Sequence, residues 1–114
     1  MKNVLFVCTG NYDRSPTAEE MFSNLKELTV KSAGTSPTGM SPSSKQVTKE
    51  HLEWADVIFA MEECHREAML KINASVEHKI IVLHVPNKYY KGQPELKKLL
   101  LKRLAPYFGL KNYS

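Results

Sequence analysis

The sequence predicts an α/β domain in which a parallel sheet is covered by helices on both faces. Short apolar runs alternate with helical segments along the chain, an order typical of strand–helix–strand units. The apolar runs are nearly continuous, as expected of parallel strands buried on both faces. We expect strands over residues 3–7, 30–32, 57–60 and 80–83. We expect helices over residues 16–28, 44–54 and 62–71, and from residue 94 to just before Pro106.

A short polar loop joins the first strand to the first helix. The strand, Asn3–Val7, is an apolar run that begins almost at the N-terminus. Ser15-Pro16 is a typical helix start, with Ser15 as the N-cap and Pro16 at the first helical position. Glu19 and Glu20 then fall in the first turn, where acidic side chains are favourable.

The remaining elements follow from apolar runs and from the positions of proline and glycine. Residues 34–44 contain two prolines and two glycines, which predicts an irregular loop before the short second helix. Val57–Ala60 and Ile80–Leu83 are buried strands on either side of the third helix. A loop through residues 86–93 leads to the last helix, which Pro94 opens and which ends before Pro106.

Length and composition indicate one domain, residues 1–114. A chain of 114 residues has room for a single core, and its 42% hydrophobic and 25% charged residues are ordinary for a globular protein. No apolar run approaches the roughly 20 residues of a membrane span, and no signal-peptide pattern is present. The cysteines number two, which favours a reducing compartment, by default the cytoplasm. A structural disulfide between Cys8 and Cys64 is the weaker alternative.

The net charge of +4 favours an anionic partner rather than nucleic acid. The basic residues are spread through amphipathic stretches such as residues 97–103, a pattern typical of a solvated helix face. No nucleic-acid-binding motif accompanies them. Cys64-His65 lacks the spacing of metal ligands. We therefore expect no nucleic acid, membrane, metal or cofactor.

The most informative feature is the spacing of Cys8 and Arg14, which have five residues between them, with Ser15 directly after Arg14. The thiol is predicted to lie on a tight loop between the end of a strand and the positive end of a helix. Backbone N–H groups converge on an anion in such a loop, and a thiolate is stabilised against its thiol. Arg14 adds a planar fork that matches two phosphate oxygens. Together these features predict a site for a tetrahedral oxyanion such as inorganic phosphate or sulfate.

The loop resembles the phosphate-binding loop of the low-molecular-weight protein tyrosine phosphatases. The signature of that family is a cysteine, five residues, an arginine, and then serine or threonine, and Gly10, Asn11 and Pro16 also match. Later landmarks follow in the family's order over nearly the whole chain, although the middle is shorter: Ser32-Ala33-Gly34-Thr35, Ala55-Asp56, Met61-Glu62 and Asn87-Lys88-Tyr89-Tyr90. The similarity is greatest to a compact, bacterial-looking branch of the family.

This resemblance implies a three-layer, doubly wound phosphatase fold with four parallel strands in the order 2-1-3-4. The Cys8 loop then lies at the carboxyl end of the central first strand, where such sheets bind ligands. The implied phosphate-binding residues are Cys8, Thr9, Gly10, Asn11, Tyr12, Asp13 and Arg14.

The implied reaction has two steps: Cys8 attacks phosphorus, and water then hydrolyses the phosphocysteine. Arg14 and the loop amides hold the phosphoryl oxygens, and Ser15 donates a hydrogen bond to the departing thiolate. Asn11 braces the loop through its side chain, and Gly10 permits its sharp turn. The implied substrate is a phosphotyrosine protein or a small aryl phosphate.

The resemblance departs from the family at the general acid. The family has an aspartate before Pro-Tyr-Tyr, and this chain has Asn87 at that catalytic position. A carboxamide has no transferable proton at neutral pH, and losing a general acid typically costs about 10²–10⁴ in rate. The alternatives are that another acid serves, with His84, Glu62 and Glu63 as candidates, or that turnover is impaired.

Four further residues have alternative roles. Asp13 occupies the position at which some relatives carry a protective cysteine, so its carboxylate either faces the sulfur of Cys8 and opposes its ionisation, or turns to solvent or to a nearby base. Tyr89 and Tyr90 are in positions that wall the family's site, and Tyr12 is a candidate for the opposite wall. Each tyrosine can equally be an ordinary packing residue.

Three functions remain open from the sequence. The leading one is a phosphomonoester hydrolase of the protein tyrosine phosphatase type, with activity weakened if Asn87 has no substitute. The second is a degenerate phosphate- or phosphotyrosine-binding module, which Asn87 favours. The third is an arsenate reductase, which is the least favoured because that chemistry needs further cysteines and only Cys64 is left.

Overall fold

A computed structural model describes residues 2–36 and 44–108 of the chain. Its centre is a sheet of four parallel strands in the order β2-β1-β3-β4. The strands are β1 (Lys2–Cys8), β2 (Leu28–Gly34), β3 (Val57–Ala60) and β4 (Ile80–Val82). The parallel pairing and the strand order confirm the predicted fold class.

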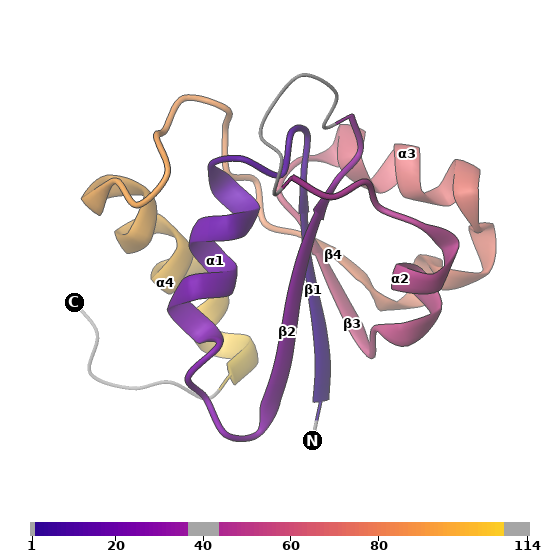
Figure 1. The fold of residues 1–114 in the computed structure, drawn as a ribbon, viewed down its shortest axis with the longest axis horizontal. Coiled ribbons are helices and arrows are strands. Elements are labelled where there is room, and N and C mark those ends of the chain that lie inside the picture. Colours follow the sequence, from indigo (N-terminus) through magenta and orange to yellow (C-terminus); the bar gives the residue numbers. More distant parts are fainter. Residues whose placement is uncertain (1, 37–43, 109–114) are drawn as a thin grey trace.

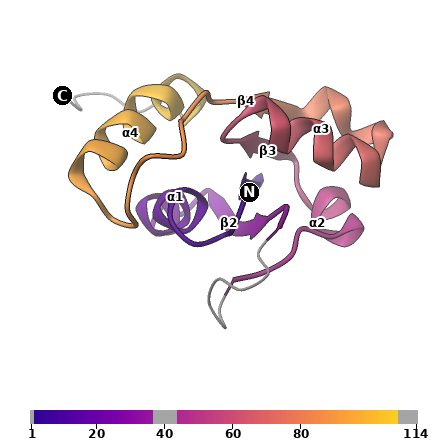
Figure 2. The ribbon, with the colours of Figure 1, turned by 90° about the horizontal axis from the view of Figure 1, so that it is seen from above.

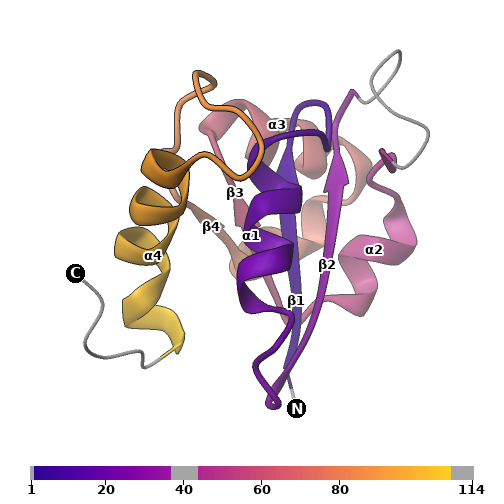
Figure 3. The same ribbon diagram turned by 60° about the vertical axis from the view of Figure 1, so that its left-hand side comes forward.

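Helices cover both faces of this sheet. One face carries α1 (Arg14–Phe22) and α4 (Pro94–Phe108), which contact each other, and the opposite face carries α2 (Lys49–Trp54) and α3 (Glu63–Ile72) (Figures 1 and 2). A short 3₁₀ helix, η1 (Ala74–Lys79), connects α3 to β4 and was not predicted. Figure 3 shows α1 and α4 lying along the same side of the strands. Within the described ranges, no helix is long and apolar enough to cross a membrane.

The alternation of side chains along β1 divides the core into two halves. Val4 and Phe6 pack with Phe59 and the inner face of α4, a cluster that continues through Leu96, Leu100 and Leu104. Leu5 and Val7 point the other way, into a cluster beneath α2 and α3 that contains Leu52, Ile58 and Met69. Because β1 is buried on both faces, its carboxyl end is held firmly where the Cys8 loop begins.

The first helix differs from its prediction at both ends. It begins at Arg14, with Asp13 as an N-cap that forms no side-chain capping bond, so Ser15 lies inside the helix and is not the cap. The Ser15 hydroxyl is instead directed at Cys8. The helix ends at Phe22 rather than near residue 28, because Leu28 pairs with Lys2 and already belongs to β2. As a result, the first turn contains no acidic residue, contrary to the expectation for Glu19 and Glu20.

The other boundaries shift for local reasons. Pro106 does not end α4, which continues to Phe108, because the Phe108 ring packs against Phe22 and Phe59 and holds the last turn in place. The second helix begins at residue 49 and not at residue 44, since Thr48 caps it by accepting the His51 N–H. Strand β2 is longer than predicted, and β4 ends one residue earlier. Of the predicted loop over residues 34–44, residues 37–43 lie outside the described ranges.

Candidate active site

The candidate site is the loop of residues 9–13, between the carboxyl end of β1 and the start of α1. In the sheet, Cys8 pairs with Gly34 of β2, and Val7 pairs with Ala60 of β3, so three strand ends meet at this edge (Figure 1). A cavity of about 190 Å³ opens here. The described residues that line it are Cys8, Thr9, Gly10, Tyr12, Asp13, Arg14 and Asn87.

The thiol of Cys8 is buried and lies 3.0 Å from the Ser15 hydroxyl oxygen. That oxygen accepts a hydrogen bond of 3.0 Å from the Asn11 side-chain amide. The serine proton is therefore free to point to the sulfur, since the other acceptor within reach, the carbonyl of Ala33, lies farther away at 3.4 Å. A hydroxyl that donates to the sulfur stabilises the thiolate.

The Asn11 side chain ties the loop to two neighbouring segments. Its amide nitrogen also donates to the Ser32 hydroxyl (2.9 Å), and that hydroxyl donates to Glu19 (2.5 Å). Its side-chain oxygen accepts the Lys45 backbone N–H at 2.7 Å. Asn11 and Ser32 are buried, so these bonds are shielded from water.

The tight turn of the loop is at Asn11, not at Gly10. Asn11 has a φ of 49°, in the left-handed region that asparagine tolerates better than most residues. A glycine is required on the facing strand: a Cβ on Gly34 would lie 2.6 Å from the Thr9 carbonyl oxygen and 2.8 Å from the Asn11 nitrogen. Gly34 therefore allows β2 to pass close beneath the loop.

Arg14 is 2% exposed and has a fixed orientation. Its Nη1 donates to Glu62 (2.5 Å) and to the Val85 carbonyl (2.8 Å), which uses both hydrogens of that nitrogen. The edge formed by Nε and Nη2 is then the one left for a bound oxyanion.

The backbone amides of the loop are further candidate donors to an anion. Within the described residues, the N–H groups of residues 9–13 donate to no protein atom. The first N–H groups of α1 add the positive end of a helix dipole. Unpaired amides around a thiolate and a guanidinium form an anion-binding site.

His65 lies beneath the loop and is 1% exposed. Its Nδ1 accepts the Glu62 backbone N–H at 2.9 Å, and its Nε2 lies 2.8 Å from the Thr9 hydroxyl oxygen. Burial, and then the charge of Arg14, lower the pKa of His65 from 6.5 to about 4. In the sequence the pair Cys64-His65 is noted only as an unsuitable metal site, and no spacing signal links His65 to Thr9, which is itself among the predicted phosphate-binding residues.

The nearest group of metal-ligating atoms is formed by Glu62, Cys64 and His65. Both ring nitrogens of His65 already have hydrogen-bond partners, and the Glu62 carboxylate pairs with Arg14. These residues therefore do not fit a metal ion without breaking the contacts that hold Arg14 and the loop.

Of the residues considered for proton transfer, only Asn87 lines the cavity. Glu62 pairs with Arg14, and Glu63 pairs with Arg66 on α3. His84 is exposed, has a φ of 57°, and is not part of the described lining. The geometry thus brings Asn87, but none of the three alternative acids, to the lining of the site.

Asp13 lines the cavity and also accepts the Lys91 backbone N–H at 2.9 Å. Asp13 is therefore not turned fully to solvent. Its partner is a backbone N–H and not a basic side chain. With Thr17, whose hydroxyl accepts the Gly92 N–H at 3.0 Å, it attaches the loop of residues 86–93 to α1.

The three predicted wall residues lie in different places. Tyr12 is 49% exposed and lines the cavity. Tyr89 packs against the core cluster of α4, and Tyr90 is 77% exposed. Neither Tyr89 nor Tyr90 is among the described lining residues, so their role as walls remains a prediction.

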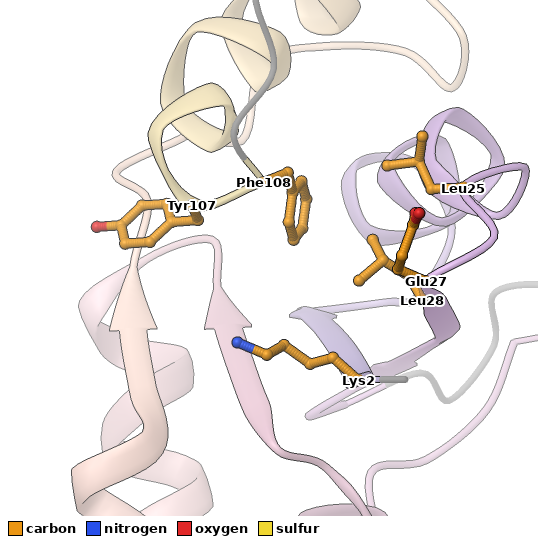
Figure 4. Close-up of a pocket in the computed structure, with 6 residues that line it drawn as sticks. All are labelled: Lys2, Leu25, Glu27, Leu28, Tyr107 and Phe108. Atoms are coloured by element: carbon orange, nitrogen blue, oxygen red, sulfur yellow. The ribbon is translucent and has the colours of Figure 1, made fainter.

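A larger cavity of about 520 Å³ lies at the other end of the molecule, near the start of β1 (Figure 4). Its described lining is Lys2, Leu25, Glu27, Leu28, Tyr107 and Phe108. Among these described lining residues, Tyr107 is the one that carries a hydroxyl, and none carries a thiol or an imidazole. The chemistry of the smaller cavity, and not cavity size, therefore identifies the candidate site.

Comparisons with known proteins show which family this chain resembles. A family model described as low molecular weight phosphotyrosine protein phosphatase matches residues 3–43. A protein-arginine-phosphatase of Bacillus subtilis (strain 168) is 30% identical, over 71% of this chain and 69% of the relative. A protein-arginine-phosphatase of Geobacillus stearothermophilus is 33% identical, over 60% of this chain and 60% of the relative. That match spans less than two thirds of the relative's length. The structure of Vibrio vulnificus Wzb in complex with benzylphosphonate has a TM-score of 0.78 at 22% identity, over 93% of this chain and 96% of that one, which supports the fold.

Proposed function

Because this chain belongs to the low molecular weight phosphotyrosine protein phosphatase family, we propose that it hydrolyses phosphomonoesters through a phosphocysteine on Cys8. The observation that carries this proposal is the loop itself. A buried thiol, a fixed guanidinium edge and loop amides that have no acceptor among the described residues surround one small cavity. The relatives found are phosphatases, which does not favour a protein that only binds phosphate.

In the first step the Cys8 thiolate attacks phosphorus, a sulfur–phosphorus bond forms, and the bond to the leaving oxygen breaks. The loop amides and the Nε–Nη2 edge of Arg14 stabilise the charge on the three remaining oxygens. The leaving oxygen faces the side of the cavity that Asn87 lines. It departs as an anion or takes a proton from water, because Asn87 has none to give.

In the second step a water molecule attacks the phosphocysteine. The sulfur–phosphorus bond breaks, inorganic phosphate leaves, and the sulfur departs as a thiolate. The Ser15 hydroxyl, 3.0 Å from the sulfur, donates to this thiolate as its charge develops. No step in this scheme requires a metal or an organic cofactor.

The proposed substrate is a phosphotyrosine protein or a small aryl phosphate. Tyr12 offers a ring at the mouth of the cavity against which an aromatic leaving group can stack. Inorganic phosphate or sulfate is expected to occupy the same loop as product or analogue.

Phosphoarginine is a second candidate substrate. Both relatives that are at least 30% identical carry the name protein-arginine-phosphatase. The phosphoryl group would bind in the same way, and the bond broken would be phosphorus–nitrogen. Initial rates on matched phosphotyrosine and phosphoarginine peptides, at equal concentration, decide between the two.

The activity is tested by steady-state hydrolysis of p-nitrophenyl phosphate. We expect measurable turnover, and we expect Cys8→Ser to reduce it by at least about 10⁴-fold while phosphate still binds. Residual activity in the purified Cys8→Ser variant close to that of the unmodified chain would exclude the phosphocysteine. Stoichiometric phosphate binding without turnover on any aryl phosphate would instead support the binding module.

A further inference from the structure

We propose that His65 is a positioning residue that turns the hydroxyl proton of Thr9 towards the bound oxyanion, which makes Thr9 a side-chain donor to the phosphoryl group. This inference rests on the proposed function, because it concerns the same anion site. It adds a donor that the backbone amides and Arg14 do not supply.

The hydrogen bonds of His65 fix which ring nitrogen carries the proton. Its Nδ1 accepts the Glu62 backbone N–H at 2.9 Å, so that nitrogen is unprotonated. In the neutral ring the proton must then be on Nε2. The lowered pKa of His65, about 4, agrees with a neutral ring at physiological pH.

Two donors approach the Thr9 hydroxyl oxygen. Because Nε2 carries the proton, the bond of 2.8 Å runs from His65 to the Thr9 oxygen. Nη2 of Arg14 approaches the same oxygen at 3.5 Å, a long contact but also from a donor. Two donors thus face the two lone pairs of this oxygen, and the hydroxyl proton has to point away from both.

The Thr9 hydroxyl is also close to the expected position of the oxyanion. Thr9 lines the cavity together with Cys8 and Arg14. Its hydroxyl oxygen is next to Nη2, which belongs to the guanidinium edge left free for an oxyanion. An oxyanion held by that edge would lie within reach of a proton directed away from Arg14 and His65. A neutral hydroxyl whose lone pairs are both occupied is a stronger donor, because hydrogen bonds polarise one another.

His65 also caps α3, so its two roles must be separated. Asparagine places an acceptor near the position of Nδ1, and glutamine places a donor near the position of Nε2. His65→Asn therefore keeps the Glu62 contact and loses the donor to Thr9. His65→Gln keeps the donor and loses the capping acceptor.

The test measures the affinity of the whole chain for inorganic phosphate by calorimetry, with melting temperatures recorded in parallel. We expect His65→Asn and Thr9→Val each to weaken phosphate binding about 10-fold, the loss typical of a hydrogen bond to a charged group. The double variant should be no weaker than Thr9→Val alone, because both changes remove the same donor. His65→Gln and Thr9→Ser should bind within about 3-fold of the unmodified chain, with His65→Gln melting earlier.

If Thr9→Val binds phosphate as tightly as the unmodified chain, the inference is overturned. It is also overturned if Thr9→Ser and Thr9→Val lose the same amount of phosphate affinity. Fully additive losses in the double variant would also contradict it. If His65→Asn does not fold, the comparison of Thr9→Val with Thr9→Ser still decides whether the hydroxyl donates. Failure of the unmodified chain to bind phosphate would contradict the proposed function itself, which is a different result from unchanged binding in the variants.

Discussion

The nucleophile side of the site is held by buried hydrogen bonds, whereas the side that faces the leaving group lies on an exposed loop. Cys8, Asn11, Ser15 and Ser32 are all buried, and they form one connected network between β1, α1 and β2. Most of the 86–93 loop is exposed, and two side chains of the α1 region, those of Asp13 and Thr17, accept its backbone N–H groups.

This difference matches what each side has to do. The thiolate and the phosphoryl oxygens need fixed donors, and buried bonds fix them at no cost during the reaction. The leaving group differs between substrates, so the loop that meets it can vary without disturbing the nucleophile. Asn87, the residue predicted to depart from the family pattern, lies on this exposed side.

The largest expected effect comes from restoring an acid on the exposed side. Asn87→Asp should raise the rate on poor leaving groups such as phenyl phosphate by up to about 10²–10⁴. For the unmodified chain, log kcat/KM should fall steeply with leaving-group pKa, and the aspartate should flatten that dependence. Asn87→Ala is the matched control and should resemble the unmodified chain.

A flat dependence in the unmodified chain would show that another donor acts. His84→Asn and Glu63→Gln would then identify it by loss of activity. Neither side chain lines the cavity in the structure, so we expect neither variant to be impaired.

The second effect is a pH dependence of stability from His65, beneath the nucleophile side. In the unfolded chain its imidazole takes up a proton below about 6.5, and in the folded chain only below about 4. The unfolded state therefore binds more protons between these values, and the free energy of unfolding falls as the pH decreases through them. The full loss is roughly 3 kcal/mol, and it is absent above about pH 7.

Urea unfolding at a series of pH values measures this dependence. His51, whose pKa is also lowered by burial, contributes to the same range. The quantity to compare is thus the difference in the free energy of unfolding between the unmodified chain and His65→Gln at each pH. A constant difference between pH 7 and pH 4 would mean that the imidazole titrates alike in both states.

The third effect concerns the bond to the sulfur. Ser15→Ala should slow hydrolysis of the phosphocysteine by about 10–100-fold, because a hydrogen bond to a charged group typically contributes about 1.5–3 kcal/mol. Since Ser15 acts mainly as the thiolate leaves, a burst of p-nitrophenol should appear before the slow steady state. Ser15→Thr is the control that retains a hydroxyl. A steady state without a burst would place the loss in the first step instead.

The two sides of the site also differed in how well the sequence predicted them. The buried strand, the Cys8–Arg14 spacing and the helix that follows are local signals, so the sequence located the loop, and the structure places Cys8, Arg14 and Ser15 around it. Ser15-Pro16 predicts Ser15 as the N-cap, because a serine before proline usually has that role. In the structure the Ser15 hydroxyl instead makes a tertiary contact with the sulfur.

Contacts between distant segments had no sequence signal. Glu62, directly before α3, and His65, on α3, contact Arg14 and Thr9. The sequence named Glu62 only as a family landmark and a candidate acid, and nothing in the spacing links His65 to Thr9. Gly34 is needed because β2 passes close to the loop, which only the strand pairing reveals. The extension of α4 through Pro106 likewise depends on aromatic packing and not on local propensity.

The smallest effect should come from loosening the exposed loop. Asp13 accepts the Lys91 N–H at 2.9 Å, and Asp13→Ala removes this acceptor. A partly exposed hydrogen bond typically contributes about 1 kcal/mol, so amide exchange at Lys91 should speed up about 5-fold. The Gly92 N–H, which donates to Thr17, should change less. Asp13→Asn keeps an acceptor oxygen and serves as the control. Amide exchange of the β1 residues should stay the same in both variants, since no bond of the buried network involves the Asp13 side chain. Faster exchange at β1 in Asp13→Ala would show that the two sides of the site are coupled, and the comparison between them would then fail.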